Sequence, residues 1–352
     1  MTMRSLGCVR LSVVLSVCLA MLFATTCDVR GAGTPVNLVQ GSAGMVWMPI
    51  LVGREMKYFE AEGLDVNYII TGGGAKAAQA LVTGSADFAA TTMSDAINAR
   101  RQGADVRVLA ALLRQYPTDC VIRNDAAQRA RISSKSPIGD RIKALRNLKI
   151  GLGGQGSPGD QLIIWLARRA RLDPNRDVQR IFLGTDVAVL AALQNGAIDV
   201  FCYGPPTSTR AVMSGNALFL FHIVGGNDLP EISHFPNAVL ATTQRFAREH
   251  PDVVDRMARG YVKAVVFMQR EPDTIAGVIK PLFANMDVAT FDASFDSAKA
   301  GFPRTPVLQR KDVQAVIDFA RDTTGEPISI TANDLLDNSW VIKAQQELHQ
   351  TR

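Results

Sequence analysis

Short apolar runs alternate along this chain with longer segments of helical periodicity. The first series predicts strand, helix, strand, helix and strand at residues 36–40, 45–59, 64–70, 75–82 and 87–90. A second series repeats that order at residues 148–152, 158–171, 178–183, 187–194 and 199–202. Near-continuous apolar strands that alternate with helices are typical of parallel sheets covered on both faces. The pattern therefore predicts an α/β protein.

The two series are related by a constant offset of 112 residues. At this offset four glycines and two aspartates of the first series fall on identical residues of the second: Gly41 on Gly153, Gly44 on Gly156, Gly72 on Gly184, Gly84 on Gly196, Asp65 on Asp177 and Asp87 on Asp199. Self-similarity at a fixed offset is typical of a duplicated supersecondary unit. The sequence thus predicts two lobes, each built on one sheet.

Ligands of open α/β sheets bind at the carboxyl ends of the strands. Two such edges that face each other would form a cleft between the lobes. The loops expected there are residues 41–46, 72–75 and 91–94 of the first series and 153–157, 184–186 and 203–206 of the second.

One of these loops carries Gly151-x-Gly153-x-x-Gly156, the spacing of a dinucleotide-binding turn. Ser157 and Pro158 are good first residues for a helix, and Asp160 lies at the acidic position of a capping box, so the helix is predicted to begin after the third glycine. The matching loop at residues 41–44 lacks the glycine triplet. We therefore favour a helix N-terminus that offers N–H groups to a polar or anionic ligand. The alternative is a tight turn without a ligand.

The N-terminus is typical of a secretory signal peptide. Arg4 and Arg10 precede the apolar run "LSVVLSVCLAMLFA" at residues 11–24, which is shorter than the roughly 20 residues that span a bilayer. We expect residues 1–32 to be a leader and the mature protein to be periplasmic. The alternatives are lipid attachment at Cys27 and an anchor that is not cleaved.

Composition agrees with an exported globular protein. The chain is 47% hydrophobic and 20% charged, and its 352 residues exceed what one core usually holds. The net charge of +5 is mild, and lysines and arginines do not cluster with aromatic residues, so nucleic acid is not an expected partner. Beyond the leader region only Cys120 and Cys202 remain, without a CxxC motif or a His/Cys cluster. We expect no metal site and two buried thiols, with a disulfide as the alternative that an oxidising compartment permits.

Three stretches resemble a known family. They are "GREMKYFEAEGLDVNYIITGGGAKAAQALVTGSADFAATTMSDAI", "LKIGLGGQGSPGD" and "LAALQNGAIDVFCYGPP", at residues 53–97, 148–160 and 190–206. Together they resemble the exported solute-binding proteins of ABC importers, in the nitrate, taurine, alkanesulfonate and thiamine-precursor (SsuA- and NMT1-like) group. The resemblance implies a type II periplasmic-binding-protein fold with mostly parallel sheets and two hinge strands near residues 116–123 and 237–242. It implies one lobe at 33–118 plus 238–352, to which the C-terminal segment returns, and a second at 119–237.

The resemblance also implies which loop positions contact the ligand. In this chain they are Ser42, Ala43, Gly44, Trp47, Gly73, Gly74, Thr91, Thr92, Gly156, Ser157, Thr185, Asp186, Tyr203 and Pro205. Each has a structural alternative: Trp47 as a core aromatic, Asp186 as the cap of its own helix, which we favour, and Thr91 and Thr92 as a strand end. His234, near the second hinge, is expected to be a surface or packed residue.

The resemblance implies a monomeric binding protein without a cofactor and not an enzyme. It would capture a small polar or anionic organic solute, a sulfonate, a carboxylate or a pyrimidine, and deliver it to an inner-membrane ABC permease. One departure from the family pattern weakens the case for an anionic ligand. Arg114 and Arg210 do not fall on the expected ligand-contact positions, so no arginine is placed to bind a sulfonate through two hydrogen bonds.

Two alternatives to transport remain open. One is an enzyme of the same fold, such as a thiamine-pyrimidine synthase or a small lyase. The cleft loops hold no histidine, and their nearest lysine, Lys76, lies just inside a helix. The other is a ligand sensor that docks on a receptor.

The leader gives the first testable prediction. We expect the mature chain to begin between Thr25 and Gly33, because the apolar run ends just before that segment. The measurement is intact-mass spectrometry of protein from the periplasmic fraction. An intact Met1 terminus would contradict it.

Overall fold

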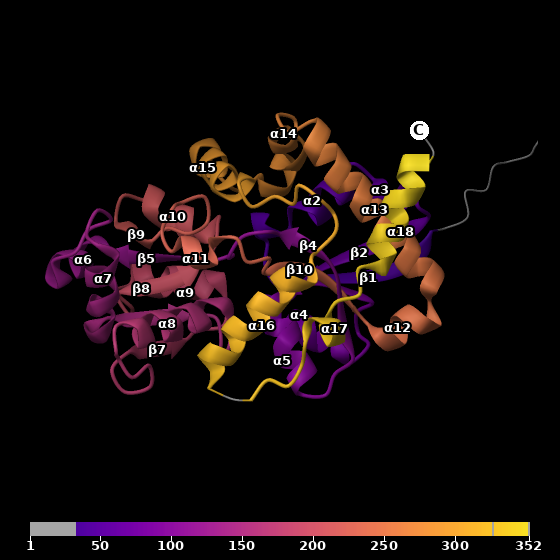
Figure 1. Cartoon of the computed structure of the whole chain (residues 1–352). Helices are drawn as coiled ribbons and strands as arrows, with labels where there is room; N and C mark the ends of the chain where they lie inside the picture. Colours follow the sequence, from indigo (N-terminus) through magenta and orange to yellow (C-terminus); the bar gives the residue numbers. More distant parts are fainter. Residues whose placement is uncertain (1–32, 326, 351–352) are drawn as a thin grey trace, which may run out of the picture. The chain divides into compact units, whose positions relative to one another are not determined.

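The computed structural model describes residues 33–325 and 327–350. The predicted leader and Cys27 lie outside this range. Two five-stranded mixed sheets organise the described chain, one in each lobe (Figure 1). Among the described helices, none is long and apolar enough to cross a membrane.

The first sheet has the strand order β2-β1-β3-β10-β4. β1 pairs in parallel with β2 and β3, whereas β10 runs antiparallel to β3 and β4. The strand bounds are β1 Thr34–Gln40, β2 Leu64–Ile70, β3 Phe88–Thr92, β4 Val106–Leu113 and β10 Ala238–Thr243. The strands predicted at 36–40, 64–70 and 87–90 are confirmed with small shifts of their ends.

The second sheet has the equivalent order β7-β6-β8-β5-β9. β6 pairs in parallel with β7 and β8, and β5 runs antiparallel to β8 and β9. The bounds are β5 Asp119–Arg123, β6 Lys149–Leu152, β7 Gln179–Phe182, β8 Val200–Tyr203 and β9 Ala217–Phe221. Each sheet therefore contains one antiparallel strand. This strand is β10 beside β3 in the first sheet and β5 beside β8 in the second.

The 112-residue repeat is confirmed by equivalent contacts at equivalent positions of the two sheets. Leu38 pairs with Phe88 in the first sheet, and Ile150 pairs with Val200 in the second. The two aspartates of the repeat play the same part: Oδ2 of Asp87 accepts the backbone N–H of Asn37 at 2.8 Å, and Oδ2 of Asp199 accepts that of Lys149 at 3.0 Å. These carboxylates tie the start of the third strand to the first strand in each lobe.

Helices cover both faces of the first sheet (Figure 1). On one face a large apolar core packs against η1 Met45–Trp47, α2 Met48–Glu55, α3 Tyr58–Ala61, α12 Gln244–Glu249, α13 Pro251–Arg270, α14 Ile275–Ile279, η3 Lys280–Phe283 and α18 Ser339–Gln350. On the other face a second core packs against α4 Gly74–Val82, α5 Met93–Arg101, α16 Arg310–Thr324 and α17 Ala332–Leu335. C-terminal helices, α13, α16 and α18 among them, thus pack on the first sheet.

The second sheet is covered in the same way. One core includes α6 Asn124–Ala130, α7 Ile138–Lys143, η2 Ala144–Asn147, α8 Pro158–Arg169 and α11 Pro230–Ser233. The opposite core includes α9 Asp186–Gln194 and α10 Thr207–Met213. Phe319 of α16 belongs to the first of these cores, and its ring contacts Tyr116, Trp165 and Phe235. The C-terminal segment therefore also packs on the second lobe, which the sequence analysis did not foresee, and α15 Val288–Lys299 contacts α10 there.

The helix predicted at residues 45–59 is wrong in one respect, because it is broken. Lys57 adopts a left-handed conformation with φ of 55°, which ends α2 and starts α3. The break lets the Phe59 ring fold back between two glycines. A Cβ at Gly53 would lie 2.4 Å from that ring, and one at Gly260 would lie 2.6 Å from it. The fully buried Phe59 side chain thus joins α2 to α13.

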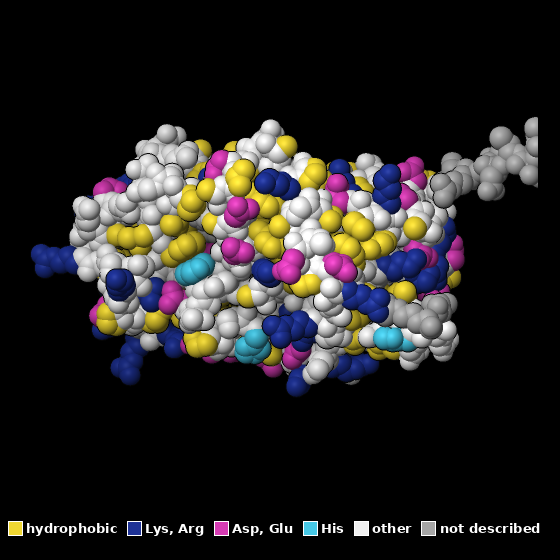
Figure 2. Space-filling model, turned by 90° about the horizontal axis from the view of Figure 1, so that it is seen from above, with side chains coloured by type: hydrophobic (Ala, Val, Ile, Leu, Met, Phe, Trp, Pro, Cys, Tyr) yellow, Lys and Arg dark blue, Asp and Glu magenta, His cyan; other side chains and the backbone are white. Residues whose placement is uncertain are grey.

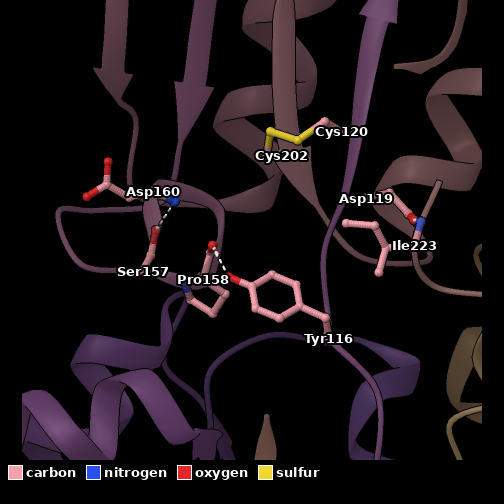
Figure 3. The surroundings of a disulfide bond; sticks show 8 residues. All are labelled: Tyr116, Asp119, Cys120, Ser157, Pro158, Asp160, Cys202 and Ile223. Atoms are coloured by element: carbon pink, nitrogen blue, oxygen red, sulfur yellow. Dashed lines mark hydrogen bonds between the residues drawn. A yellow bond between two sulfur atoms is a disulfide. The ribbon is translucent and has the colours of Figure 1, made fainter. Parts of the chain in front are cut away.

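The expectation of two free thiols is wrong. Cys120 and Cys202 form a disulfide (Figure 3). The two cysteines are directly opposite each other on the antiparallel strands β5 and β8. They are 82 residues apart in the chain, so only the strand pairing brings them together.

We expect the disulfide to stabilise the second lobe by about 2–4 kcal/mol, because it restricts the unfolded chain. Denaturant unfolding of the oxidised protein, with and without reductant, measures this. The control is the double variant Cys120→Ser with Cys202→Ser. Its unfolding curve should match that of the reduced protein and should not change when reductant is added. Superimposable curves for oxidised and reduced wild type would contradict the prediction.

Candidate functional site

A cavity of about 240 Å³ lies between the two lobes, at the carboxyl ends of their parallel strands. Its wall is formed by the loops that follow β1, β2 and β3 and by those that follow β6, β7 and β8. Ten predicted ligand positions line it: Ser42, Gly44, Trp47, Gly73, Gly74, Thr92, Ser157, Asp186, Tyr203 and Pro205. Contact of these residues with a ligand stays a prediction.

Four predicted positions lie outside the lining of this cavity. Ala43 is exposed, and Thr91 is buried, with its hydroxyl donating to the Gly74 carbonyl at 3.2 Å. Thr185 caps α9, because its Oγ1 accepts the Ala188 N–H at 3.1 Å. The expectation that Asp186 is this cap is therefore wrong. Asp186 is the first residue of the helix, and its Oδ1 accepts the Val187 N–H at 3.0 Å.

Gly156 lines a second, larger and more polar cleft instead. Its φ of +75° is the conformation that favours glycine, and its carbonyl accepts from Asn98 Nδ2 at 3.4 Å. A side chain at Gly156 would strain the backbone and strike Asn98 in the other lobe. A substitution there would disturb the contact between the lobes before it tested a ligand.

The loop before α8 satisfies much of its own hydrogen bonding. As predicted, Ser157 is the N-cap, and its Oγ accepts the Asp160 N–H at 3.4 Å (Figure 3). Oδ2 of Asp160 in turn accepts the Gly156 N–H at 2.8 Å, and Arg180 pairs with the same carboxylate. The loop therefore offers fewer free N–H groups to an anionic ligand than the sequence analysis expected.

The segment between β4 and β5 approaches the backbone of the second lobe beside the cavity. A Cβ at Gly204 would lie 2.2 Å from the carbonyl oxygen of Pro117, so glycine is required for this approach. One buried hydrogen bond joins the two lobes, and a second one fixes the segment between β4 and β5, whose Tyr116 ring packs in the second lobe's core, to the start of α8. The Tyr116 hydroxyl donates to the Pro158 carbonyl at 2.6 Å (Figure 3), and Ser94 Oγ donates to Oε1 of Gln161 at 2.8 Å. The cavity is thus held between directly bonded lobes.

Aromatic and proline side chains form the apolar part of the wall. Trp47 is only 3% exposed, and its indole N–H donates to the Ser42 carbonyl at 2.9 Å, so it is both a core residue and a wall residue. Across the cavity the Tyr203 hydroxyl donates to the Gly184 carbonyl at 3.1 Å. The cavity's prolines are Pro117, Pro158, Pro205 and Pro206. Flat rings can pack against such surfaces.

Few charged side chains line the cavity. They are Lys76, Asp95 and Asp186, and no arginine is among the described lining residues. Arg114 is instead paired with Asp312 at 2.9 Å, and Arg210 is exposed on α10. The site therefore has no guanidinium that could bind a sulfonate or carboxylate through two parallel hydrogen bonds. His234 packs edge-on against Phe235, away from the cavity lining.

Asp95 is the residue that sequence reasoning missed. It lies at the third position of α5, is 7% exposed and lines the cavity. Burial raises the pKa of this carboxyl from 3.8 to about 6, although hydrogen bonds from Thr92 and Thr91 act in the opposite direction. The spacing Thr92-x-x-Asp95 is that of a capping box, which was the available signal. That signal indicates a helix start and does not reveal a cavity wall.

On the face seen in Figure 2, basic and acidic side chains are interspersed over the surface. No group of His, Cys, Asp and Glu among the described residues could hold a metal ion.

Comparisons with known proteins agree with this geometry. The model of the NMT1-like family matches residues 45–282. The candidate binding protein YtlA of Bacillus subtilis (strain 168) is 23% identical over 93% of this chain and 95% of its own length. A candidate aliphatic sulfonates-binding protein of the same organism is 24% identical, with 85% of each chain covered.

Among solved structures, the alkanesulfonate-binding protein SsuA from Xanthomonas axonopodis pv. citri, bound to MOPS, has the same fold. Its TM-score is 0.68 at 14% identity, with 87% of this chain and 100% of that chain covered. These relatives are named as binding proteins and not as enzymes.

The raised pKa of Asp95 predicts a pH-dependent contribution to stability. Between about pH 4 and pH 6 the folded protein retains a proton that the unfolded chain has lost, so this contribution declines as the pH rises. A rise from 3.8 to about 6 corresponds to about 3 kcal/mol, at about 1.4 kcal/mol per pH unit. The measurement is the difference in unfolding free energy between wild type and Asp95→Asn from pH 3.5 to 7.5.

The variant should gain about 3 kcal/mol relative to wild type across that range, because asparagine cannot ionise. Subtracting the two curves removes the titration of every other group. A difference that is constant with pH would contradict the prediction.

Proposed function

The chain belongs to the NMT1-like family, and we propose that it is the substrate-binding protein of an ABC-type importer, which captures a small organic solute in the cavity between its lobes. The observation that carries the proposal is the cavity itself. Corresponding loops of two lobes with equivalent sheets converge on it, and the hydrogen bond from Ser94 to Gln161 joins the lobes beside it. A duplicated α/β unit with its strand ends on one cavity is suited to enclosing a ligand from both sides.

The volume supports a small ligand. About 240 Å³ lies below the roughly 300–1,000 Å³ typical of drug-sized pockets. Trp47, Tyr203 and the prolines would supply apolar contact, while Ser42, Thr92 and Ser157 would supply hydroxyl groups. Candidate solutes are small sulfonates, carboxylates and pyrimidines.

We also propose the division of the chain that such a mechanism needs. One lobe comprises residues 33–118 and 238–352, and the other comprises residues 119–237. The hinge strands expected near residues 116–123 and 237–242 are largely strands β5 and β10 inside the two sheets, so the bending would fall on the short connections before them, at residues 114–118 and 234–237. The protein would act as a periplasmic monomer that delivers its solute to an inner-membrane permease.

A cavity-filling variant tests the proposal. Gly44 has φ of −97°, which any residue can adopt, and a Cβ there would lie 3.1 Å from the Ser42 hydroxyl, which can rotate away, and 3.5 Å from the carbonyl oxygen of Pro205 in the other lobe. Gly44→Leu should therefore fill the interlobe space. The matched control is Gly139→Leu, because Gly139 is exposed and has no atom within 4 Å of its Cβ position.

The measurement is a thermal-shift and calorimetric screen with ethanesulfonate, benzoate and 4-amino-5-hydroxymethyl-2-methylpyrimidine. A solute that binds should stabilise the wild type and the control by about 2.7 kcal/mol at a hundredfold excess over Kd. Gly44→Leu should lose this binding while keeping a normal ligand-free melting temperature. Unchanged Kd in a folded Gly44→Leu would place the ligand elsewhere and contradict the proposal.

A further inference from the structure

We propose that Asp95 selects the solute: its carboxylate accepts a hydrogen bond or a positive charge from the ligand, so the ligand carries an amino, amidine or protonated amine group and is not a simple sulfonate. This inference rests on the proposed function and narrows the class of solute. It departs from what the name of the sulfonate-binding relative would suggest for this chain.

The first support is the place of the carboxylate. Asp95 lines the cavity together with Thr92 and Gly74, and it also borders the larger polar cleft. It therefore lies in the wall between the two spaces. Thr92 Oγ1 donates to its Oδ2 at 2.6 Å, so the carboxylate is held at this place by its own helix start.

The second support is the helix that faces this carboxylate. A Cβ at Gly74 would lie only 2.0 Å from Oδ2 of Asp95, so the carboxylate lies directly against the first turn of α4. The N-cap of α4 is Gly73, which has no side chain to cap the helix. A helix N-terminus attracts anions. In this lobe the protein's own carboxylate already occupies that position.

In the second lobe an acidic side chain also lies at a helix start, that of α8, although there it belongs to the helix itself. The Asp160 carboxylate accepts the Gly156 N–H, and Ser157 accepts the Asp160 N–H. A sulfonate in the cavity would thus meet two helix starts that already have acidic partners. It would also approach Asp95 with the same sign of charge in a poorly solvated space, where charges repel more strongly than in water.

The third support is that no ion pair in the described part of the chain compensates Asp95 on the side of the cavity, since Arg101, Arg168 and Arg180 line the neighbouring polar cleft and not the cavity. Among the described residues no ion pair includes Asp95. Lys76, the basic side chain in the lining, is exposed, and Asp186 adds a second carboxylate. Burial raises the pKa of Tyr203, and the negative charges of Asp186 and Asp95 raise it further. The cavity therefore favours positive over negative groups.

The remaining wall indicates the rest of the ligand. Trp47 and Tyr203 offer ring surfaces, on which a flat ring or a cation can pack. A small amino-substituted heteroaromatic compound or an aryl amidine combines such a ring with donors for Asp95. The inferred class is therefore a flat ring that carries N–H donors.

The experiment compares probes that share a ring and differ in the polar group. The probes are benzamidine and 4-amino-5-hydroxymethyl-2-methylpyrimidine as donors, and benzenesulfonate and benzoate as anions. Calorimetry gives Kd for wild type, for Asp95→Asn and for the control Asp65→Asn. Asp65 is an exposed carboxylate of the first lobe outside the cavity lining, so its variant changes the net charge equally.

We expect at least one donor probe to bind the wild type and the control with equal Kd, and Asp95→Asn to weaken it at least tenfold. Anionic probes should bind more weakly than donors to the wild type and should gain affinity in Asp95→Asn. A merely structural role for Asp95 would weaken all probes alike, so that result overturns the inference. Tight binding of benzenesulfonate to the wild type, unchanged in Asp95→Asn, overturns it as well, as does a screen in which no donor probe binds.

The two proposals can fail separately. If a sulfonate binds the wild type and Gly44→Leu abolishes that binding, the binding function stands and the donor class is wrong. If binding of every probe survives in a folded Gly44→Leu, the cavity is not the binding site and the proposed function falls. Ligand-free melting curves show whether each variant is folded.

Discussion

The carboxylate of Asp119 holds together the two segments in which the chain passes from one sheet to the other. It is fully buried at the start of β5, just after the first crossing. Its Oδ1 accepts the N–H group of Ile223 at 2.8 Å (Figure 3) and that of Val224 at 2.8 Å, at the start of the second crossing. Ser208 donates to Oδ2 at 2.9 Å. A buried carboxylate requires such donors, and removing it would leave two backbone N–H groups without a partner.

The first crossing also lies in the wall of the cavity, through Pro117 and Thr118. Each crossing leads into the one antiparallel strand of its sheet, β5 or β10, and the parallel strands of both lobes end at the interlobe space. The disulfide between Cys120 and Cys202 fixes β5 to β8 next to Asp119, and Cys202 also lines the cavity. Packing of Phe319 on the second lobe adds a third connection outside the two crossings. We infer that the freedom of the lobes to move is limited on several sides.

Four aspartate carboxylates accept hydrogen bonds from backbone N–H groups near the two sheets. Asp87 and Asp199 serve the first strand of each lobe, Asp160 serves the loop before α8, and Asp119 serves the crossing. Asp95 differs from these four because it lies in the wall of the cavity. One acidic group of this kind thus lies where a solute would meet it, and our proposal of a donor-bearing solute rests on that position.

The sequence by itself determined the elements whose causes are local. Apolar periodicity located the strands at residues 64–70 and 148–152 nearly to the residue, the glycine and aspartate pattern revealed the duplication, and the Ser157-Pro158 pair marked the start of α8. Tertiary structure decided what depends on distant partners. Cys120 meets Cys202 only through strand register, and the break at Lys57 places the Phe59 ring between glycines of two helices. Asp95 lines the cavity because α4 and α5 meet there and the second lobe lies opposite. No local sequence pattern contains that information.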